Sequence, residues 1–326
     1  MDTYQPSSNV MPVIVLSYGT PENLDQIEAY YTHIRKGRPP APEALQDLTD
    51  RYARIGGTFP LRQNTDRQVQ ALEDQLNSLD VGVQFVCFQG LKHVTPFVED
   101  GVAAIAAQGH KQALGIVLAP HYSTYSVANY VKRAKEEADK YGIRMNCVEH
   151  YHVHPWLLTA LAKRVNRVLE QFAQEGVDKN DVRVIFSAHS LPERIIEMGD
   201  PYPQQLNETA TKVAALCDVS NWQFAWQSAG QNGMVWLGPD IQDVLRQIGT
   251  EEGVKYALIC PIGFVSDHLE VLFDIDIECQ AVAAEVGMRL KRTESLNTDP
   301  EFIATLADVL IQMLPDALSL EEQAIE

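Results

Sequence analysis

The run FSAHSLPERIIEMGDPYP, residues 186–203, continues a stretch rich in β-branched residues, Val182 to Ile185, that is typical of a buried strand. His189 stands where that strand gives way to a loop, because Pro192 and the glycine and prolines after it prevent a continuous helix. In open α/β sheets, ligands bind beyond the carboxyl ends of the strands. His189 is therefore a candidate for chemistry, although a histidine that only hydrogen-bonds its own loop gives the same pattern.

Strand-like apolar runs alternate with helical patterns along most of the chain. The expected strands are residues 13–17, 83–88, 113–119, 182–187, 224–227 and 256–261. Apolar residues spaced for a helix lie between them, at residues 65–79, 127–141 and 156–172. This alternation predicts an α/β fold in which parallel sheets are flanked by helices.

The chain has 326 residues, which exceeds the size at which one core usually stops growing, so two domains are expected. The polar segment 175–181 separates a long helical pattern from a new buried strand. We therefore predict two halves, residues 1–175 and 176–326, with a crevice between them. Residues 116–123 and 184–190 both end a strand in a histidine followed by a hydroxyl residue, an echo that is consistent with duplication of one half.

Composition narrows the classes of partner. The net charge of -18 and the pI near 4.9 argue against nucleic acid and against an anionic membrane surface. Residues 35–67 differ locally, since Lys and Arg outnumber Asp and Glu there. No run approaches the ~18 apolar residues of a membrane span, and the residues before Val13 lack the pattern of a signal peptide.

The five cysteines are far apart and include no C-x-x-C. This spacing argues against a zinc site and against a cysteine-held iron–sulfur cluster. An odd, scattered set of cysteines fits a reducing compartment, so we expect a cytoplasmic protein. Neither half contains G-x-G-x-x-G or a P-loop sequence, so no nucleotide site is indicated.

A series of acidic residues follows the last predicted strand. If Ser266 or Asp267 caps a helix, Glu270, Asp274 and Glu278 fall at i, i+4 and i+8 on one face. Like charges at this spacing destabilise a helix by about 0.2–0.5 kcal/mol per pair. Two explanations account for this series equally well. One is a solvated acidic face. The other is a path for a hydrated divalent cation, since such cations bind carboxylates and imidazole.

Other polar and aromatic residues also follow predicted strands. His189 and Glu270 each follow a buried strand of the second half, so we expect them to face each other at the crevice. Tyr18 ends the first strand and is either a metal ligand or hydrogen-bond donor, or an ordinary half-buried tyrosine beside a turn. Residues 30–39 and 50–61 mix aromatics, arginines and glycine turns, which suits a large planar anionic ligand.

Over nearly its whole length the chain resembles the ferrochelatase family, and most closely the short coproporphyrin ferrochelatases of Gram-positive bacteria. The specific part of the resemblance is Ser-Ala-His-Ser-Leu-Pro at residues 187–192 together with Asp-His-Leu-Glu at residues 267–270. Further matching runs are residues 18–21 (YGTP), 30–38, 90–93 (GLKH), 119–123 (APHYS), 199–202 (GDPY), 236–239 (WLGP) and 263–264 (GF).

The resemblance implies two Rossmann-like, chelatase-type halves with the porphyrin in the cleft between them. It also implies insertion of Fe(II), the substrate metal, with loss of two pyrrole protons. His189 and Glu270 resemble the pair that binds the metal and handles protons, and Asp274 and Glu278 continue the metal-binding carboxylates. Tyr18 resembles the tyrosine that faces the iron from the other side of the ring. The residues that resemble those holding the porphyrin and its propionates are Arg35, Arg51, Tyr52 and Tyr130.

Two positions depart from the family pattern. Phe59 stands where serine is usual, and Ala229 stands where a charged residue is frequent. We expect these changes to alter porphyrin binding rather than to remove the chemistry. The resemblance predicts that the chain inserts iron into coproporphyrin III in haem synthesis. We also expect a monomer and, from the net charge, no nucleic-acid partner. The alternatives are a chelatase for another metal or for protoporphyrin IX, and a non-catalytic tetrapyrrole or iron carrier. The sequence leaves open whether His189 binds iron, accepts a proton, or does both.

Overall fold

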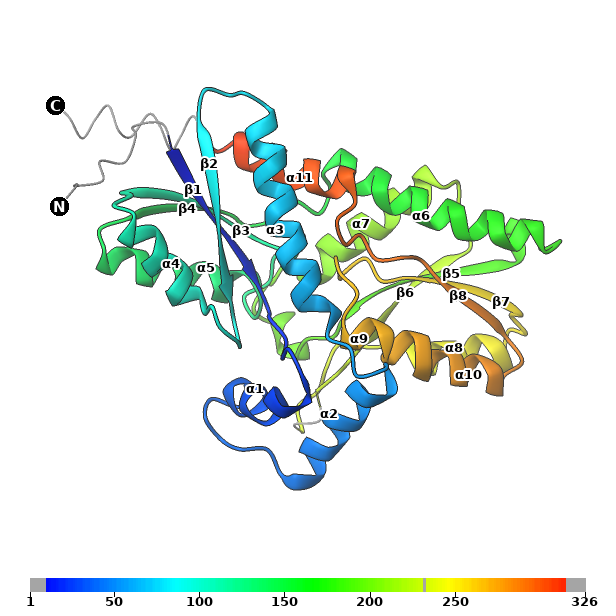
Figure 1. The fold of residues 1–326 in the computed structure, drawn as a ribbon. Coiled ribbons are helices and arrows are strands. Elements are labelled where there is room, and N and C mark those ends of the chain that lie inside the picture. The colour runs from blue at the N-terminus through cyan, green and yellow to red at the C-terminus, as the bar shows by residue number, and fades with distance from the viewer. Residues whose placement is uncertain (1–9, 231–232, 315–326) are drawn as a thin grey trace. The chain divides into compact units, whose positions relative to one another are not determined.

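The computed structural model describes residues 10–230 and 233–314 (Figure 1). These residues form two compact units, each with its own sheet. Among the described residues, the first unit contains 10–47, 59–151 and 298–314, and the second contains 48–58 and 152–297. No helix in the described ranges is long and apolar enough to cross a membrane.

The first unit is built on a four-stranded parallel sheet in the order β2-β1-β3-β4. The strands are β1 (Val10–Ser17), β2 (Gln84–Leu91), β3 (Gln112–Val117) and β4 (Arg144–Val148). The helices are η1 (Leu24–Gln26), α1 (Ile27–Ile34), α3 (Pro60–Ser78), α4 (Val98–Ala107), α5 (Val127–Lys140) and α11 (Pro300–Ile311), while α2 (Pro42–Arg54) begins here and ends in the second unit.

The second unit has a parallel sheet in the order β6-β5-β7-β8. The strands are β5 (Val182–His189), β6 (Trp222–Gln227), β7 (Tyr256–Cys260) and β8 (Arg289–Arg292). The α-helices are α6 (Pro155–Gln174), α7 (Tyr202–Leu216), α8 (Ile241–Thr250), α9 (Leu269–Leu272) and α10 (Gln280–Glu285). Two short 3₁₀ turns, η2 (Lys179–Asp181) and η3 (Glu193–Ile195), and the π-helical η4 (Asp274–Cys279) complete it.

The predicted α/β architecture with two parallel sheets is confirmed, and each predicted strand and helix coincides with an observed one. Of the four edge strands, β4 and β8 were not predicted. Both are short, and β8 has the sequence RLKR, which carries no run of apolar residues. An edge strand pairs on one side only, so its residues need not be apolar.

The two sheets share one strand order. In each, the first strand in sequence lies between the second and the third, and the fourth lies at the edge. This order supports a repeated architecture. The echo between residues 116–123 and 184–190 does not trace that repeat, because β3 is the third strand of its sheet whereas β5 is the first strand of the other.

The division of the chain differs from the predicted boundary at residues 175 and 176. Helix α6 packs against α7 and β7, so the second unit begins at His152, before that helix. Helix α11 packs against α3 and β3, and the chain therefore returns to the first unit at Thr298. A polar segment in the sequence marks the end of a helix, but it does not show which sheet that helix covers.

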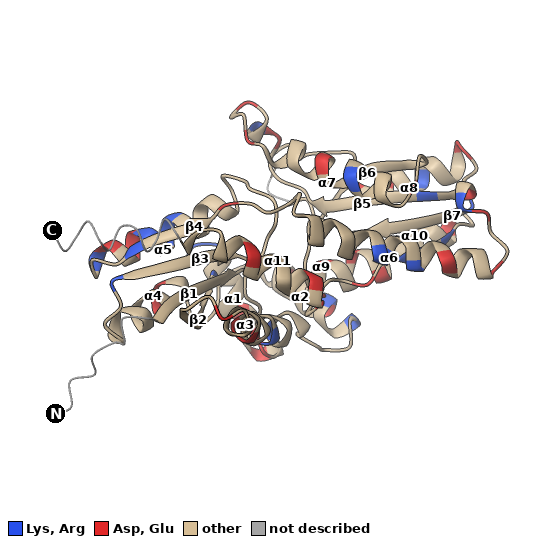
Figure 2. Cartoon of the chain, turned by 90° about the horizontal axis from the view of Figure 1, so that it is seen from above, with Lys and Arg blue, Asp and Glu red and all other residues tan. Residues whose placement is uncertain are grey.

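Each unit has its own apolar core. Ile14 of β1 packs with Val102 of α4 in the first unit. Charged residues of both signs lie along α5 outside this cluster (Figure 2). In the second unit, Ile185 of β5 packs with Val271 and Ile275 from α9 and η4. The acidic segment after β7 is therefore anchored to the sheet through its apolar side chains.

Candidate active site

His189 is the last residue of β5, and its Nδ1 lies 2.9 Å from Oε2 of Glu270. Two hydrogen bonds fix the end of this strand. The backbone N–H of Ser190 donates to the carbonyl of Gln227 at 2.8 Å, and the Tyr202 hydroxyl donates to the carbonyl of His189 at 3.1 Å. The expected pairing of His189 with Glu270 is thus present in the second unit.

Gly263 permits the loop after β7 to approach the end of β5. Its N–H donates to the carbonyl of Ser187 at 3.1 Å, and a Cβ at this position would lie 2.4 Å from the Cβ of Ala188. Rotation of a side chain cannot relieve an overlap with a Cβ, so a larger residue would separate the two strand ends. Glycine at position 263 therefore helps to bring α9 next to β5.

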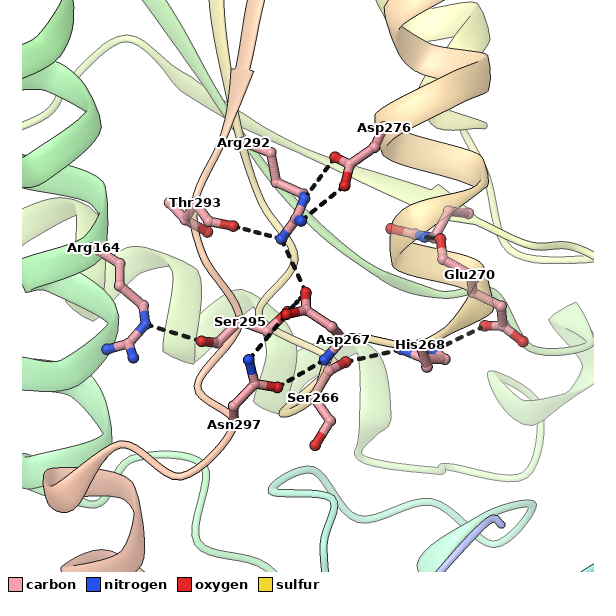
Figure 3. Close-up of polar contacts among 11 residues, drawn as sticks. Arg164, Ser266, Asp267, His268, Glu270, Asp276, Arg292, Thr293, Ser295 and Asn297 are labelled. Atoms are coloured by element: carbon pink, nitrogen blue, oxygen red, sulfur yellow. Dashed lines mark hydrogen bonds and ion pairs between the residues drawn. The ribbon is translucent and has the colours of Figure 1, made fainter. Parts of the chain in front are cut away.

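Glu270 lies in the first turn of α9, which begins later than predicted. The residue that precedes the helix is His268, with extended backbone, rather than Ser266 or Asp267. The carboxylate of Asp267 instead accepts a hydrogen bond from Asn297 Nδ2 at 2.9 Å (Figure 3).

Gln227 at the end of β6 connects β5, which carries His189, with the backbone of Glu270. Its Oε1 accepts a hydrogen bond from Ser187 Oγ at 2.9 Å, and its Nε2 donates to the backbone carbonyl of Glu270 at 3.0 Å. The side chain is buried, so both of its polar atoms depend on these partners. Sequence reasoning did not assign a role to this residue.

The charges of the pair stabilise each other. Burial alone would lower the pKa of His189, but the charge and hydrogen bond of Glu270 and the charge of Asp274 outweigh it, so the pKa is raised. Burial would raise the pKa of Glu270, but His189 and His268 together hold it well below its usual range. Because the two side chains are 33% and 36% exposed, water screens part of this attraction.

The carboxylates after Glu270 do not form the straight α-helical series that was predicted. Helix α9 ends at Leu272 and the π-helical η4 follows. The N–H groups of Ile277 and Glu278 both donate to the carbonyl of Phe273, at 3.1 and 3.0 Å. A π-helical turn takes more residues than an α-helical one, so Glu270, Asp274 and Glu278 do not follow the i, i+4, i+8 line of an α-helix. Such turns are frequent at functional sites.

Asp274 is buried, and burial together with the charge of Glu270 raises its pKa to about 7. Ser228 Oγ donates a hydrogen bond to its carboxylate. Glu278 accepts a hydrogen bond from Gln242 Nε2 at 3.1 Å. Within residues 10–230 and 233–314, no three His, Cys, Asp or Glu side chains group closely enough to hold a metal ion.

Replacing Ser228 by alanine is expected to raise the pKa of Asp274 further, because the hydrogen bond from Ser228 stabilises the ionised carboxylate. Serine and alanine meet the same constraint at the positive φ of this position. The carboxyl ¹³C shift of Asp274, followed against pH, measures the change. In the control Ser190→Ala, which removes a hydroxyl bonded to the carbonyl of Leu237, the pKa should not move. An unchanged or lowered pKa in Ser228→Ala would contradict the expectation.

Arg51 and Tyr52, which were predicted to lie in the first half, belong to the second unit. The Cζ atoms of Arg51 and Arg54 lie 5.0 and 4.9 Å from the centre of the Phe273 ring. The charge of Arg51 also opposes the rise in the pKa of Asp274. Tyr52 is 3% exposed. These contacts place the end of α2 beside Phe273 and Asp274. The predicted contacts of Arg51 and Tyr52 with a ligand stay predictions.

Tyr18 follows β1 in the first unit and is 41% exposed. Its ring centre lies 4.6 Å from that of His93. Lys92 Nζ lies 5.9 Å from the Tyr18 ring and 4.9 Å from the ring of the buried Tyr130. Burial and a neighbouring arginine lower the pKa of Lys92 to about 8. Lys92 and His93 thus lie against the predicted site residues Tyr18 and Tyr130. Their position just after β2 is the signal that could have identified them.

Three further positions were singled out from the sequence. Arg35 is exposed at the end of α1, where its Cζ lies 5.8 Å from the centre of the Tyr31 ring. Phe59 directly precedes α3 in the first unit, and Ala229 follows Ser228 in the second. The effect of Phe59 and Ala229 on a ligand stays a prediction.

Comparison with known proteins identifies the family. The family model described as ferrochelatase matches residues 11–314. A coproporphyrin III ferrochelatase of Oceanobacillus iheyensis is 47% identical over 300 residues, which cover 92% of this chain and 96% of the relative. One of Bacillus subtilis is 46% identical over 310 residues, which cover 94% and 99%. The sirohydrochlorin chelatase SirB of Bacillus subtilis subspecies spizizenii, solved in complex with cobalt, shares the fold with a TM-score of 0.57 at 12% identity, covering 96% and 97% of the two chains. The chain therefore belongs to the ferrochelatase family.

Proposed function

We propose that this ferrochelatase inserts Fe(II) into coproporphyrin III, giving Fe-coproporphyrin III and two protons. The observation that carries the chemistry is the 2.9 Å contact between His189 Nδ1 and Glu270 Oε2 at the end of β5. The choice of substrate is supported by the two relatives at 47% and 46% identity, both named coproporphyrin III ferrochelatases. In such a reaction two N–H bonds of the porphyrin break and the nitrogens bind the iron.

The hydrogen bond to Glu270 assigns different roles to the two nitrogens of His189. When Nδ1 carries the proton, it donates a hydrogen bond to the carboxylate of Glu270. The lone pair of Nε2 is then available to Fe(II) or to a pyrrole proton. The raised pKa of His189 makes it a stronger base, so it retains an accepted proton more readily. Asp274, with a pKa of about 7, exchanges protons easily near neutral pH.

The other predicted residues complete the proposal. Glu270, Asp274 and Glu278 provide carboxylates along which hydrated Fe(II) reaches His189. Tyr18 faces the iron from the opposite side of the ring. The residues proposed to hold the ring and its propionates are Arg35, Arg51, Tyr52 and Tyr130.

We further propose that the enzyme acts as a cytoplasmic monomer. Its iron is a substrate, and the reaction requires neither an iron–sulfur cluster nor a nucleotide. Residues 35–67 carry an excess of Lys and Arg in an otherwise acidic chain. This local positive charge suits a substrate with four propionates. Nucleic acid is not expected to bind an acidic protein of this kind.

An anaerobic assay of the purified protein with Fe(II) tests the proposal. The absorption spectrum of coproporphyrin III is expected to change over many turnovers, and protoporphyrin IX is expected to react more slowly. Faster reaction of protoporphyrin IX would overturn the substrate, and faster insertion of Co(II) than of Fe(II) would overturn the metal. Porphyrin binding with no turnover beyond one equivalent would identify a tetrapyrrole carrier instead.

A further inference from the structure

Arg292, the last residue of β8, contacts two carboxylates of the acidic segment. Its Nε and Nη2 donate to Oδ1 and Oδ2 of Asp276 at 2.8 and 2.9 Å. Its Nη1 lies 3.5 Å from Oδ1 of Asp267 and donates to the carbonyl of Thr293 at 2.8 Å. Figure 3 shows the guanidinium between the two aspartates. One side chain therefore connects a strand end with two points of the same acidic segment.

The two aspartates bracket Glu270. Asp267 lies just before α9, and Asp276 lies in η4, beyond it. Asp267 is held further by Ser295 Oγ at 2.7 Å and by Asn297, whose Nδ2 donates to its carboxylate and whose Oδ1 accepts from its N–H, both at 2.9 Å. The segment after β8 thus fixes the loop from which α9 begins.

The contact with Asp276 requires the geometry of arginine. Two N–H groups of one planar group meet the two oxygens of one carboxylate, which a lysine ammonium cannot reproduce. The Arg292 side chain is 14% exposed, against 36% for Asp276 and 28% for Asp267. The guanidinium of Arg292 is therefore largely shielded from water, whereas the carboxylate of Asp276 remains exposed.

We propose that Arg292 is a positioning residue for iron insertion. By bridging Asp267 and Asp276 it holds α9 and η4 in the arrangement that directs the carboxylate of Glu270 toward His189. It touches neither iron nor porphyrin. This inference rests on the proposed function, in which Glu270 and His189 act on Fe(II).

Arg292→Lys keeps the charge and removes the two-pronged contact. We expect kcat for Fe(II) insertion to fall about 10- to 100-fold, with the KM for coproporphyrin III changed by less than about 2-fold. The control is Arg289→Lys on the same strand, where the arginine pairs with Glu175 at 2.9 Å, and it should behave as the wild type. Asp276→Asn should lower kcat similarly, and the double variant should be no slower than the slower single variant.

A second measurement does not depend on turnover. The ¹⁵N shift of His189 Nδ1 at one fixed pH reports its hydrogen bond to Glu270, and it should change in Arg292→Lys and in Asp276→Asn but not in Arg289→Lys. If neither kcat nor this shift differs between Arg292→Lys and the control, the positioning role is wrong. If the shift changes while the wild-type protein inserts no iron, Arg292 still positions Glu270 against His189, and it is the proposed function that fails. Asp276→Asn serves if Arg292→Lys does not fold.

Discussion

His189→Ala is expected to slow Fe(II) insertion by about 10³-fold while coproporphyrin III still binds. A positioned base alone contributes about 10²- to 10⁴-fold, and this substitution removes the proposed metal ligand at the same time. His189 lies at a strand end, 33% exposed, so its loss leaves the core of the second unit intact. Single-turnover rates under anaerobic conditions and the quenching of porphyrin fluorescence measure the two properties separately.

The control for this substitution is His150→Ala, which removes an exposed histidine of the first unit. It should change neither property. Insertion by His189→Ala at a rate close to that of the wild type would remove His189 from the mechanism. Loss of porphyrin binding in parallel with the rate would show instead that His189 acts in holding the ring.

Glu270→Gln is expected to lower the rate of insertion about 10- to 100-fold and to shift its pH dependence toward acid. Burial lowers the pKa of His189, while the charge and hydrogen bond of Glu270 raise it, and the net effect in the wild type is a raised value. Glutamine keeps a hydrogen-bonding oxygen and removes the charge. The pKa of His189 should therefore fall in this variant.

The direction of the pH shift follows from which form of His189 is active. Only the neutral imidazole binds Fe(II) or accepts a proton, so the rate rises with pH as His189 loses its proton. In the wild type this rise is expected above the ordinary histidine pKa of 6.5, and in Glu270→Gln it should occur at lower pH. The rate of insertion measured across pH at saturating substrate tests the shift. A rise at unchanged or higher pH would show that Glu270 does not control the protonation of His189.

The fold was predictable where the chain repeats strong local patterns. Central strands such as β1 and β5 are covered by helices, so their residues are apolar and easily recognised. Strand β8 has three basic residues out of four, and it forms because β7 offers it an open edge. The return of α11 to the first unit depends on which surface it covers, and periodicity does not contain that information.

The reactive side chains of the candidate site could be predicted from the sequence, but the residues that hold them in place could not. His189 ends β5 and Glu270 follows the neighbouring strand β7, so their proximity could be expected from the parallel sheet. Gln227 and Arg292 act through hydrogen bonds to residues far away in sequence, and nothing local marks them. The π-helical turn also escaped prediction, because the residue spacing of Glu270 and Asp274 is compatible with an ordinary α-helix.

The central claim is that His189 and Glu270 act as one unit on Fe(II). It is tested most directly by anaerobic single-turnover insertion into coproporphyrin III by the wild type, His189→Ala, Glu270→Gln and the double variant. Residues that act as a unit are not additive, so the double variant should be about as slow as His189→Ala alone. A double variant slowed by the product of the two single effects would contradict the claim, since it would mean that the two side chains contribute independently.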